Sequence, residues 1–210
     1  MGREHATTSQ PADLRERQGA FVAVVGPSGV GKDTLIAYAR ERMGAGERTP
    51  VHFVRRVITR PADGSTEDNE SLSPEEFERA RAAGTFSLSW EAHGLQYGLP
   101  KSVDREIAAG HTVVANLSRA ALDGLMARYR HVAVVAITAS PETLAERLMA
   151  RGRESAGEVS ARLARASTSP TALAGAVTFI VNDGPVEKAG DALMTAIRAA
   201  GALANAPIDP

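Results

Sequence analysis

The chain of 210 residues, with 43% hydrophobic and 23% charged residues, has the size and balance of one globular domain. Its 24 basic and 25 acidic residues give a formal net charge of −1, which argues against a general nucleic-acid coat protein, because such proteins are strongly basic. The absence of cysteine excludes disulfides and thiolate zinc sites and fits a reducing compartment.

Both ends of the chain are predicted to be loose. Residues 1–18 are polar, of mixed charge, and lack the apolar region of a signal peptide. Residues 201–210 carry two prolines and are expected to form a flexible tail. No apolar run approaches the ~20 residues that a membrane-spanning helix needs. We therefore expect a cytoplasmic protein, without membrane contact, whose one folded domain covers residues 19–200.

The folded part begins with the pattern of a buried strand followed by a helix. Residues 20–25 are apolar throughout, as in a strand that is covered on both faces. The next stretch, residues 33–43, has the pattern of a helix. A further strand is predicted over residues 51–58, so the chain alternates strand and helix from its start.

The middle of the chain, from about residue 61 to residue 100, is predicted to form a small inserted lobe. Ser73-Pro74-Glu75-Glu76 is typical of a helix start, with Ser as N-cap, Pro in the first turn and Glu at the third position, and that helix should end near Gly84. Phe86–Trp90 alternates apolar and polar residues with period two, which predicts a half-buried strand. His93-Gly94 is expected to form the turn that follows.

The second half returns to alternating strands and helices. Ser102 is a candidate N-cap and Pro141 a candidate helix start. The patterns predict strands over residues 112–115, 132–138 and 177–181, and helices over residues 102–110, 141–151 and 186–199. Strands interleaved with helices predict an α/β fold, a three-layer sandwich with a mainly parallel sheet.

A glycine-rich loop between the first strand and the first helix is the sharpest signal in the chain. Backbone N–H groups can approach phosphate oxygens closely where side chains are missing, and a helix N-terminus adds partial positive charge. Lys32 supplies a full charge that can span the β- and γ-phosphates of ATP. The predicted nucleotide-binding residues of this P-loop are Gly26, Ser28, Gly29, Val30, Gly31, Lys32, Asp33 and Thr34.

One position of this loop departs from the usual pattern. The residue after the lysine is normally Ser or Thr, whose hydroxyl ligates Mg²⁺, but here it is Asp33, and Thr34 comes next. A carboxylate beside a triphosphate is repulsive unless a cation lies between them. Either Asp33 binds Mg²⁺, directly or through water, or Thr34 takes the hydroxyl role and Asp33 only stabilises the first helical turn.

These motifs resemble the guanylate-kinase branch of the P-loop nucleoside-monophosphate kinases over roughly residues 19 to 200. Thr59-Arg60-Pro61 is similar to part of the arginine segment that binds the acceptor phosphate. His93-Gly94-Leu95-Gln96-Tyr97-Gly98 resembles the His-Gly-x-x-Tyr-Gly turn. Arg151-Gly152-Arg153, followed by a helix with Arg162, resembles the lid, and Phe179–Asp183 resembles the final strand, which we expect to end near the adenine.

The sequence departs from guanylate kinases at the positions that read the base. The second arginine of the acceptor segment is missing, since Ala62 and Asp63 follow Pro61. Leu88 and Asn116 stand where the resemblance places two guanine-reading acids. A site that hydrogen-bonds a base depends strongly on such partners, so the loss of both predicts a different acceptor.

A second resemblance, to the ribose 1,5-bisphosphate phosphokinases of phosphonate breakdown, covers nearly the whole chain. It rests on Gly-Lys-Asp in the loop, on Arg55–Pro61 and on Trp90–Gly98. It implies ATP-dependent conversion of ribose 1,5-bisphosphate to 5-phosphoribosyl 1-diphosphate. The alternatives are a nucleoside-monophosphate kinase with altered base preference and a catalytically inactive guanylate-kinase-like binding domain.

The resemblance also implies roles for single residues. The predicted catalytic residues are Lys32 with Arg151 and Arg162 of a lid over residues 151–162. The predicted acceptor-binding residues are Arg56, Thr59, Arg60 and Tyr97, with Arg55 as an alternative to Arg56. The alternatives without a binding role are that the arginines form a solvated basic surface and that Tyr97 only packs the hairpin. Because the acceptor is a phosphate, mostly dianionic at pH 7, the reaction needs Arg and Mg²⁺ rather than a protein base. The expected partner is a small sugar phosphate, and a homodimer is left open.

Overall fold

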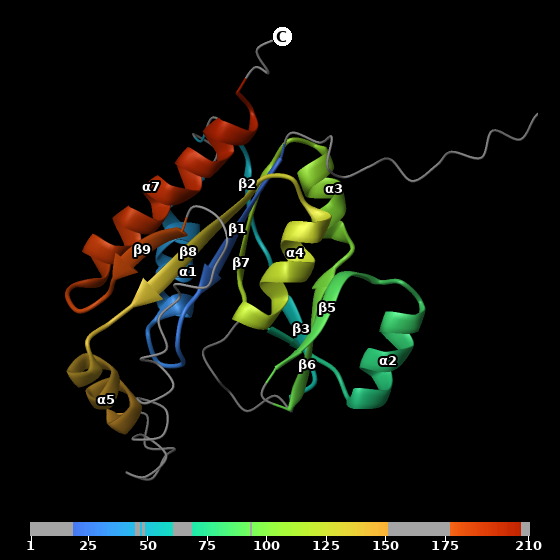
Figure 1. Cartoon of the computed structure of the whole chain (residues 1–210), viewed down its shortest axis with the longest axis horizontal. Helices are drawn as coiled ribbons and strands as arrows, with labels where there is room; N and C mark the ends of the chain where they lie inside the picture. The colour runs from blue at the N-terminus through green and yellow to red at the C-terminus, as the bar shows by residue number, and fades with distance from the viewer. Residues whose placement is uncertain are drawn as a thin grey trace, which may run out of the picture.

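The computed structural model describes residues 19–44, 47, 49–60, 69–92, 94–150 and 177–206. Its central sheet has five parallel strands in the order β2-β7-β1-β8-β9 (Figure 1). The strands are β1 (Ala20–Val25), β2 (Val51–Phe53), β7 (Thr112–Asn116), β8 (Val132–Thr138) and β9 (Val177–Val181). The predicted arm, the lid residues and the last four residues of the predicted tail lie outside the described residues.

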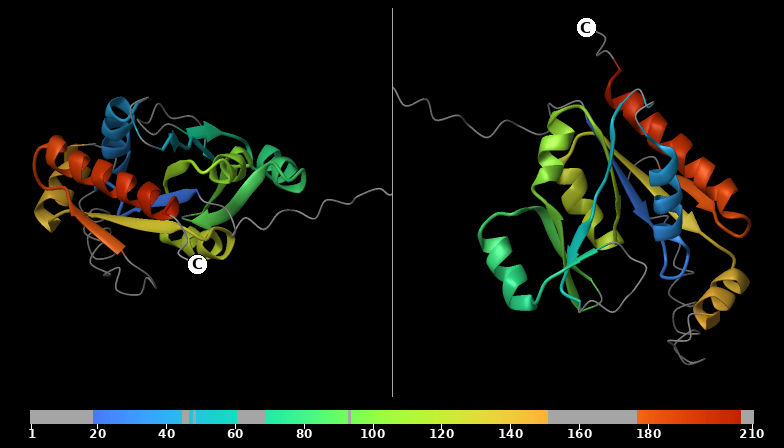
Figure 2. Two further views of the ribbon diagram at one scale, coloured as in Figure 1. Left: turned by 90° about the horizontal axis from the view of Figure 1, so that it is seen from above. Right: turned by 180° about the vertical axis from the view of Figure 1, so that it is seen from behind.

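Helices cover both faces of this sheet, as the two further views show (Figure 2). One core lies under α1 (Lys32–Arg42) and α7 (Val186–Ala204), and the other lies under α3 (Ser102–Ala108), η2 (Arg119–Ala121) and α4 (Leu122–Arg128). Strand β1 alternates between them: Val22 and Val24 face the first core, and Phe21 and Ala23 face the second. The predicted three-layer α/β sandwich is confirmed. The helix α5 (Pro141–Ala150) follows β8.

The inserted lobe is a four-stranded sheet with one helix, set beside the carboxyl ends of the central strands (Figure 1). Its strands are β3 (Arg56–Ile58), β4 (Asn69–Ser71), β5 (Phe86–Ala92) and β6 (Leu95–Pro100), and its helix is α2 (Pro74–Ala82). The expected helix start is confirmed, because Ser73 and Glu76 form a reciprocal capping box. Phe77 of α2 stacks on Phe86 of β5 at 4.7 Å between ring centroids, which holds the helix on the sheet.

The single strand predicted over residues 51–58 is wrong, because the chain changes sheets inside it. β2 pairs in parallel with β7, and the amide of Val54 still donates to the carbonyl of Val114 at 2.9 Å. β3 then pairs with β4 and β6 of the inserted lobe. Arg55 lies at the crossing and donates to the carbonyl of Asn69 at 3.1 Å. The continuous β pattern is therefore shared between two sheets, and the lobe begins at β3, before residue 61.

Two helix ends differ from the prediction, and one short helix is additional to it. α7 runs through Ala204, so residues 201–204 are helical rather than a loose tail. Gly201 does not end the helix; a Cβ there would lie 2.5 Å from Oγ1 of Thr112, so the glycine allows the helix to pass close to β7. The N-cap of α3 is Lys101 and not Ser102. The short helix α4 was not anticipated.

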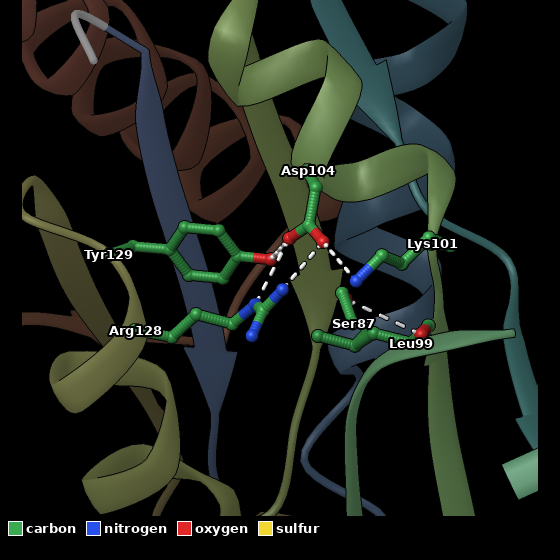
Figure 3. A network of polar contacts seen from close by, with 6 residues as sticks. All are labelled: Ser87, Leu99, Lys101, Asp104, Arg128 and Tyr129. Atoms are coloured by element: carbon green, nitrogen blue, oxygen red, sulfur yellow. Dashed lines mark hydrogen bonds and ion pairs between the residues drawn. The ribbon is translucent and has the colours of Figure 1, made fainter. Parts of the chain in front are cut away.

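A buried ion-pair network joins the inserted lobe to the helix layer (Figure 3). The carboxylate of Asp104 on α3 accepts from Nε and Nη2 of Arg128 at 3.0 and 2.6 Å, and from the hydroxyl of Tyr129 at 2.7 Å. Lys101, directly after β6, lies 3.1 Å from the same carboxylate. Burial alone would raise the pKa of Asp104, but the hydrogen bonds from these three partners outweigh it and hold the pKa below its ordinary value. This Asp104 network therefore fixes the exit of the lobe hairpin.

Within the described part of the chain, no helix combines the length and apolarity needed to cross a bilayer.

Candidate functional site

The P-loop lies between the end of β1 and the start of α1, as its sequence predicts. The Lys32 ammonium folds back over the loop and donates to the carbonyls of Gly26 at 2.9 Å and Pro27 at 3.0 Å. Gly31 has φ +92°, and a Cβ there would lie 2.6 Å from Nδ2 of Asn182. Only glycine fits this position, because both its backbone conformation and its neighbour exclude a side chain. The arrangement is a preformed phosphate cradle with one ammonium group above it.

Side chains from the far end of the chain hold this loop in shape. The carbonyl of Val30 accepts from Nδ2 of Asn182 at 2.8 Å and from Nη1 of Arg147 at 3.4 Å. Asn182 directly follows β9 and is buried. The next residue, Asp183, accepts from the amide of Ser140 at 2.7 Å at the start of α5, and this hydrogen bond lowers the pKa of its carboxyl. The strand β9 ends directly before Asn182, as expected, and the contacts of Asn182 and Asp183 link the loop to α5. The expected position of this strand end near the adenine stays a prediction.

The residue that departs from the P-loop pattern has a specific partner. Oδ1 of Asp33, in the first turn of α1, accepts from Nδ2 of Asn116 at the end of β7, at 2.7 Å. Asn116 is buried, whereas Asp33 is half-exposed and Thr34 is exposed. A carboxylate and a hydroxyl are both suitable Mg²⁺ ligands. The neutral amide of Asn116 can hold one oxygen of Asp33 and leave the other directed elsewhere, which an acid at residue 116 could not do without repulsion.

Two of the four predicted acceptor-binding residues lie together on one face of the inserted lobe. The guanidinium carbon of Arg56 lies 5.8 Å from the ring centroid of Tyr97. Tyr97 in turn stacks on Trp90, with the centroids 5.3 Å apart and the planes 10° from parallel. Arg56 is only 7% exposed and Tyr97 is half-buried. Within this Arg56–Tyr97–Trp90 face, Trp90 belongs to the second core and Tyr97 packs against it, so Tyr97 has at least a packing role.

Thr59 lies apart from that face. Its hydroxyl accepts from the backbone amide of Gln96 at 2.9 Å and lines an open groove between α2 and the β5–β6 hairpin. The same groove carries three glutamates and one arginine: Glu75, Glu78, Glu91 and Arg79. Such a surface attracts cations rather than phosphates. Arg60 is half-buried where the described part of this segment ends.

Other predicted residues take structural roles or lie outside the described residues. Leu88, at one of the two base-reading positions, packs against α4, where one of its methyl groups lies 3.0 Å from the place a Cβ on Gly124 would occupy. His93, Arg151 and Arg162 lie outside the described residues. Among residues that are described, the buried Nε1 of Trp90 and Oγ of Ser118 have no hydrogen-bond partner.

Sequence reasoning missed three contributors to this region. The sequence marks Asn116 and Asn182 only as family positions, because their partners, Asp33 and Val30, lie far away along the chain. Arg119, which directly begins η2, lines a hollow with Gly26 and Pro27 beside the P-loop. Its position after a central strand was the available signal, because the carboxyl ends of parallel strands meet at one edge of the sheet.

The chain is similar to known proteins in both sequence and fold. The family model described as an AAA domain matches residues 22–165. A ribose 1,5-bisphosphate phosphokinase of Chelativorans sp. (strain BNC1) is 48% identical over 204 residues, covering 96% of this chain and 95% of the relative. Another from Pseudofrankia inefficax is 52% identical over 179 residues, covering 85% and 90%. The guanylate kinase of Anaplasma phagocytophilum has a similar fold, with a TM-score of 0.59 at 20% identity over 87% of this chain and 86% of that one.

Proposed function

The chain belongs to the family of ribose 1,5-bisphosphate phosphokinases, and on that premise we propose how its residues divide the reaction between them. The reaction is ATP-dependent phosphorylation of ribose 1,5-bisphosphate to 5-phosphoribosyl 1-diphosphate. The observation that carries the proposal is a phosphate cradle beside a lobe that keeps Arg56 and Tyr97, while the two base-reading positions are engaged otherwise. Leu88 of the lobe packs against α4, and Asn116 at the end of β7 donates to Asp33. Such a site can hold a phosphate but offers no carboxylate to a purine at those two positions.

The donor site is the P-loop. We assign the loop amides and Lys32 to the β- and γ-phosphates of ATP, since a positioned ammonium and successive N–H groups stabilise the charge of the transferring group. The lysine already lies over the loop through its bonds to Gly26 and Pro27. Asn182 and Arg147 act on the loop through Val30, so we assign them a positioning role.

Mg²⁺ is the expected cofactor of this donor site. Asp33 is the stronger candidate ligand, because Asn116 orients its carboxylate. Thr34 is the weaker candidate, because it lies at an exposed position on α1. When bound, the ion would neutralise charge between the β- and γ-phosphates. Asn116 would keep Asp33 oriented without adding a second negative charge.

The acceptor supplies its own nucleophile. One oxygen of the phosphate on C1 attacks the γ-phosphorus of ATP, the bond from that phosphorus to the bridging oxygen breaks, and ADP leaves with the electron pair. Because a phosphate monoester is mostly dianionic at pH 7, no proton has to be removed first. The task of the protein is to bring two anions together, which we assign to Arg56, Arg60 and Tyr97 on the acceptor side.

Two predicted roles stay as proposals at positions outside the described residues. Arg151 and Arg162 are proposed to reach the transferring phosphoryl group from a lid over residues 151–162.

Thr59 is retained as a candidate acceptor residue, although its groove is acidic. We further propose a cytoplasmic location, which fits a cysteine-free kinase that consumes ATP.

The decisive experiment offers ATP and Mg²⁺ with either ribose 1,5-bisphosphate or GMP and follows ADP release and the phosphorylated product. We expect turnover with the sugar bisphosphate and a kcat/KM for GMP that is lower by ~10⁴-fold, the cost of missing base contacts in a site that depends on them. A kcat/KM that is higher for GMP than for ribose 1,5-bisphosphate would contradict the proposal and identify a nucleotide kinase instead. Binding of ATP without turnover of either acceptor would support the assignment of the donor site and contradict that of the acceptor.

A further inference from the structure

Two histidines and a glutamate converge at the end of the central sheet opposite the P-loop. His52 lies on β2, Glu106 on α3, and His111 just before β7. Figure 1 shows α3 beside the start of β7 and far from the junction of β1 with α1, where the P-loop lies. This His–Glu–His cluster has no part in the kinase reaction described above.

The three side chains point to one place. Nε2 of His52 lies 2.9 Å and Nδ1 of His111 lies 2.8 Å from the same oxygen, Oε2 of Glu106. The two imidazole rings stack with centroids 5.0 Å apart and planes 13° from parallel, and all three ligand atoms lie within 4.8 Å of one another. Their side chains are 28–42% exposed, so an ion from solvent can reach them.

The backbone holds this arrangement in advance. The register of β2 with β7 pairs His52 with Val113, close to His111 in the chain. The amide of His111 donates to the carbonyl of Glu106 at 3.1 Å, and Ala20 of β1 donates to the carbonyl of His111 at 3.2 Å. The cluster is therefore built on three elements that are fixed independently of its side chains.

We infer that the His–Glu–His cluster is a binding site for a divalent first-row transition metal, with Zn²⁺ as the representative ion. Two imidazole nitrogens and one carboxylate oxygen form a ligand set that such ions prefer, whereas Mg²⁺ and Ca²⁺ prefer oxygen alone. Bonds of 2.0–2.2 Å in a tetrahedral site place ligand atoms ~3.3 Å apart. The two nitrogen–oxygen separations have to open by only a few tenths of an ångström, and a water molecule completes the set.

The position of the site suggests what it would do. A metal there would cross-link an edge strand of the central sheet, β2, to α3 and to the start of β7. α3 also carries Asp104, whose network fixes the exit of the lobe hairpin. The ion would therefore stabilise the base on which the inserted lobe is mounted, without touching the reacting groups.

The test is a Zn²⁺ titration of the full chain in excess Mg²⁺, by calorimetry and by equilibrium dialysis with metal analysis. We expect one ion per chain, and an affinity at least ~100-fold weaker in His52→Ala, His111→Ala and Glu106→Gln, because even indirect supports of a metal ligand are worth 10–100-fold. His131→Gln, a half-buried histidine outside the cluster, serves as the matched control and should bind as the unaltered chain does. At free Zn²⁺ 100-fold above its Kd, the midpoint of thermal unfolding should rise by about 5–10 °C only where the cluster is intact.

Two results would overturn the inference. One is the absence of stoichiometric Zn²⁺ binding to the unaltered chain. The other is binding that the three cluster variants leave unchanged, which would place the ion elsewhere. Unaltered kinase turnover of the variants without Zn²⁺ serves as the check that they fold, since none of the three residues belongs to the proposed reaction machinery.

Discussion

The substitution Asp104→Asn isolates the contribution of the buried ion-pair network at the base of the inserted lobe. The amide keeps the size of the side chain and can still accept from Tyr129, but it removes the charge that Arg128 faces at 2.6 and 3.0 Å. The substituted chain is expected to fold and to be less stable, because the guanidinium then loses its counter-charge in a mostly buried place.

The size of the loss follows from the exposure of the two partners. Breaking a fully buried pair costs about 3–5 kcal/mol. The Asp104 side chain is 10% exposed, but that of Arg128 is 29% exposed and can recover part of its hydration, so we expect about 2–3 kcal/mol. For a chain of this length, that corresponds to a midpoint of thermal unfolding lower by about 4–12 °C.

The dependence on pH gives this prediction a second, independent signature. The pKa of Asp104 is lower in the folded chain than in the unfolded one, so its stabilisation is present above its ordinary pKa of 3.8 and is lost as the pH falls through the folded value. The difference between the original chain and Asp104→Asn should therefore be full at pH 7 and shrink in acid below about pH 4.

Urea unfolding at pH 7 and at acid pH measures both effects. The control is Glu41→Gln, which removes an exposed partner of Arg42 at 3.4 Å and should change stability by less than about 0.5 kcal/mol. A loss below about 1 kcal/mol for Asp104→Asn at pH 7, or a loss that does not diminish in acid, would refute the reasoning.

Three further substitutions test the site and the fold. Lys32→Ala should lower turnover on the order of 10³-fold with little change in thermal stability, and near-normal turnover would exclude the P-loop assignment. Asn116→Asp puts a second carboxylate against Asp33 and should lower kcat/KM with Mg²⁺–ATP by at least about 10-fold. In unfolding assays, adding Asp33→Asn should restore the stability lost through repulsion between the two carboxylates, whereas a packing defect at residue 116 would remain. Gly201→Ala should destabilise by about 1–3 kcal/mol, and the loss should diminish when Thr112→Ala makes room for the new methyl group.

The P-loop was predictable from sequence because its determinants are local. The buried run of β1, the glycines, Lys32 and the helix that follows are adjacent in the chain, and each residue type has its own physical reason. The same holds for α2, whose capping box spans only four residues. The expected three-layer arrangement followed from the alternation of strands and helices.

What could not be predicted depends on contacts between distant segments. Residues 51–58 have one continuous β pattern, and nothing within it indicates that β2 pairs with β7 while β3 pairs with β4 and β6. Arg56 and Thr59 are three residues apart, yet one faces Tyr97 and the other the groove beside α2. The hydrogen bond from Asn182 to Val30 spans 152 positions, so no local pattern could reveal it.

The stacking of Trp90 on Tyr97 has a practical consequence, because Trp90 is the only tryptophan among the 210 residues. Its indole is 9% exposed, and its ring nitrogen has no hydrogen-bond partner in the part of the chain that the structure describes. The intrinsic fluorescence excited near the red edge of protein absorption therefore comes from one place, the inserted lobe beside Arg56. Acceptor binding at the proposed Arg56–Tyr97 site is expected to change this fluorescence, so that a stopped-flow instrument can time it without any attached dye, and the order of mixing separates it from nucleotide binding at the P-loop.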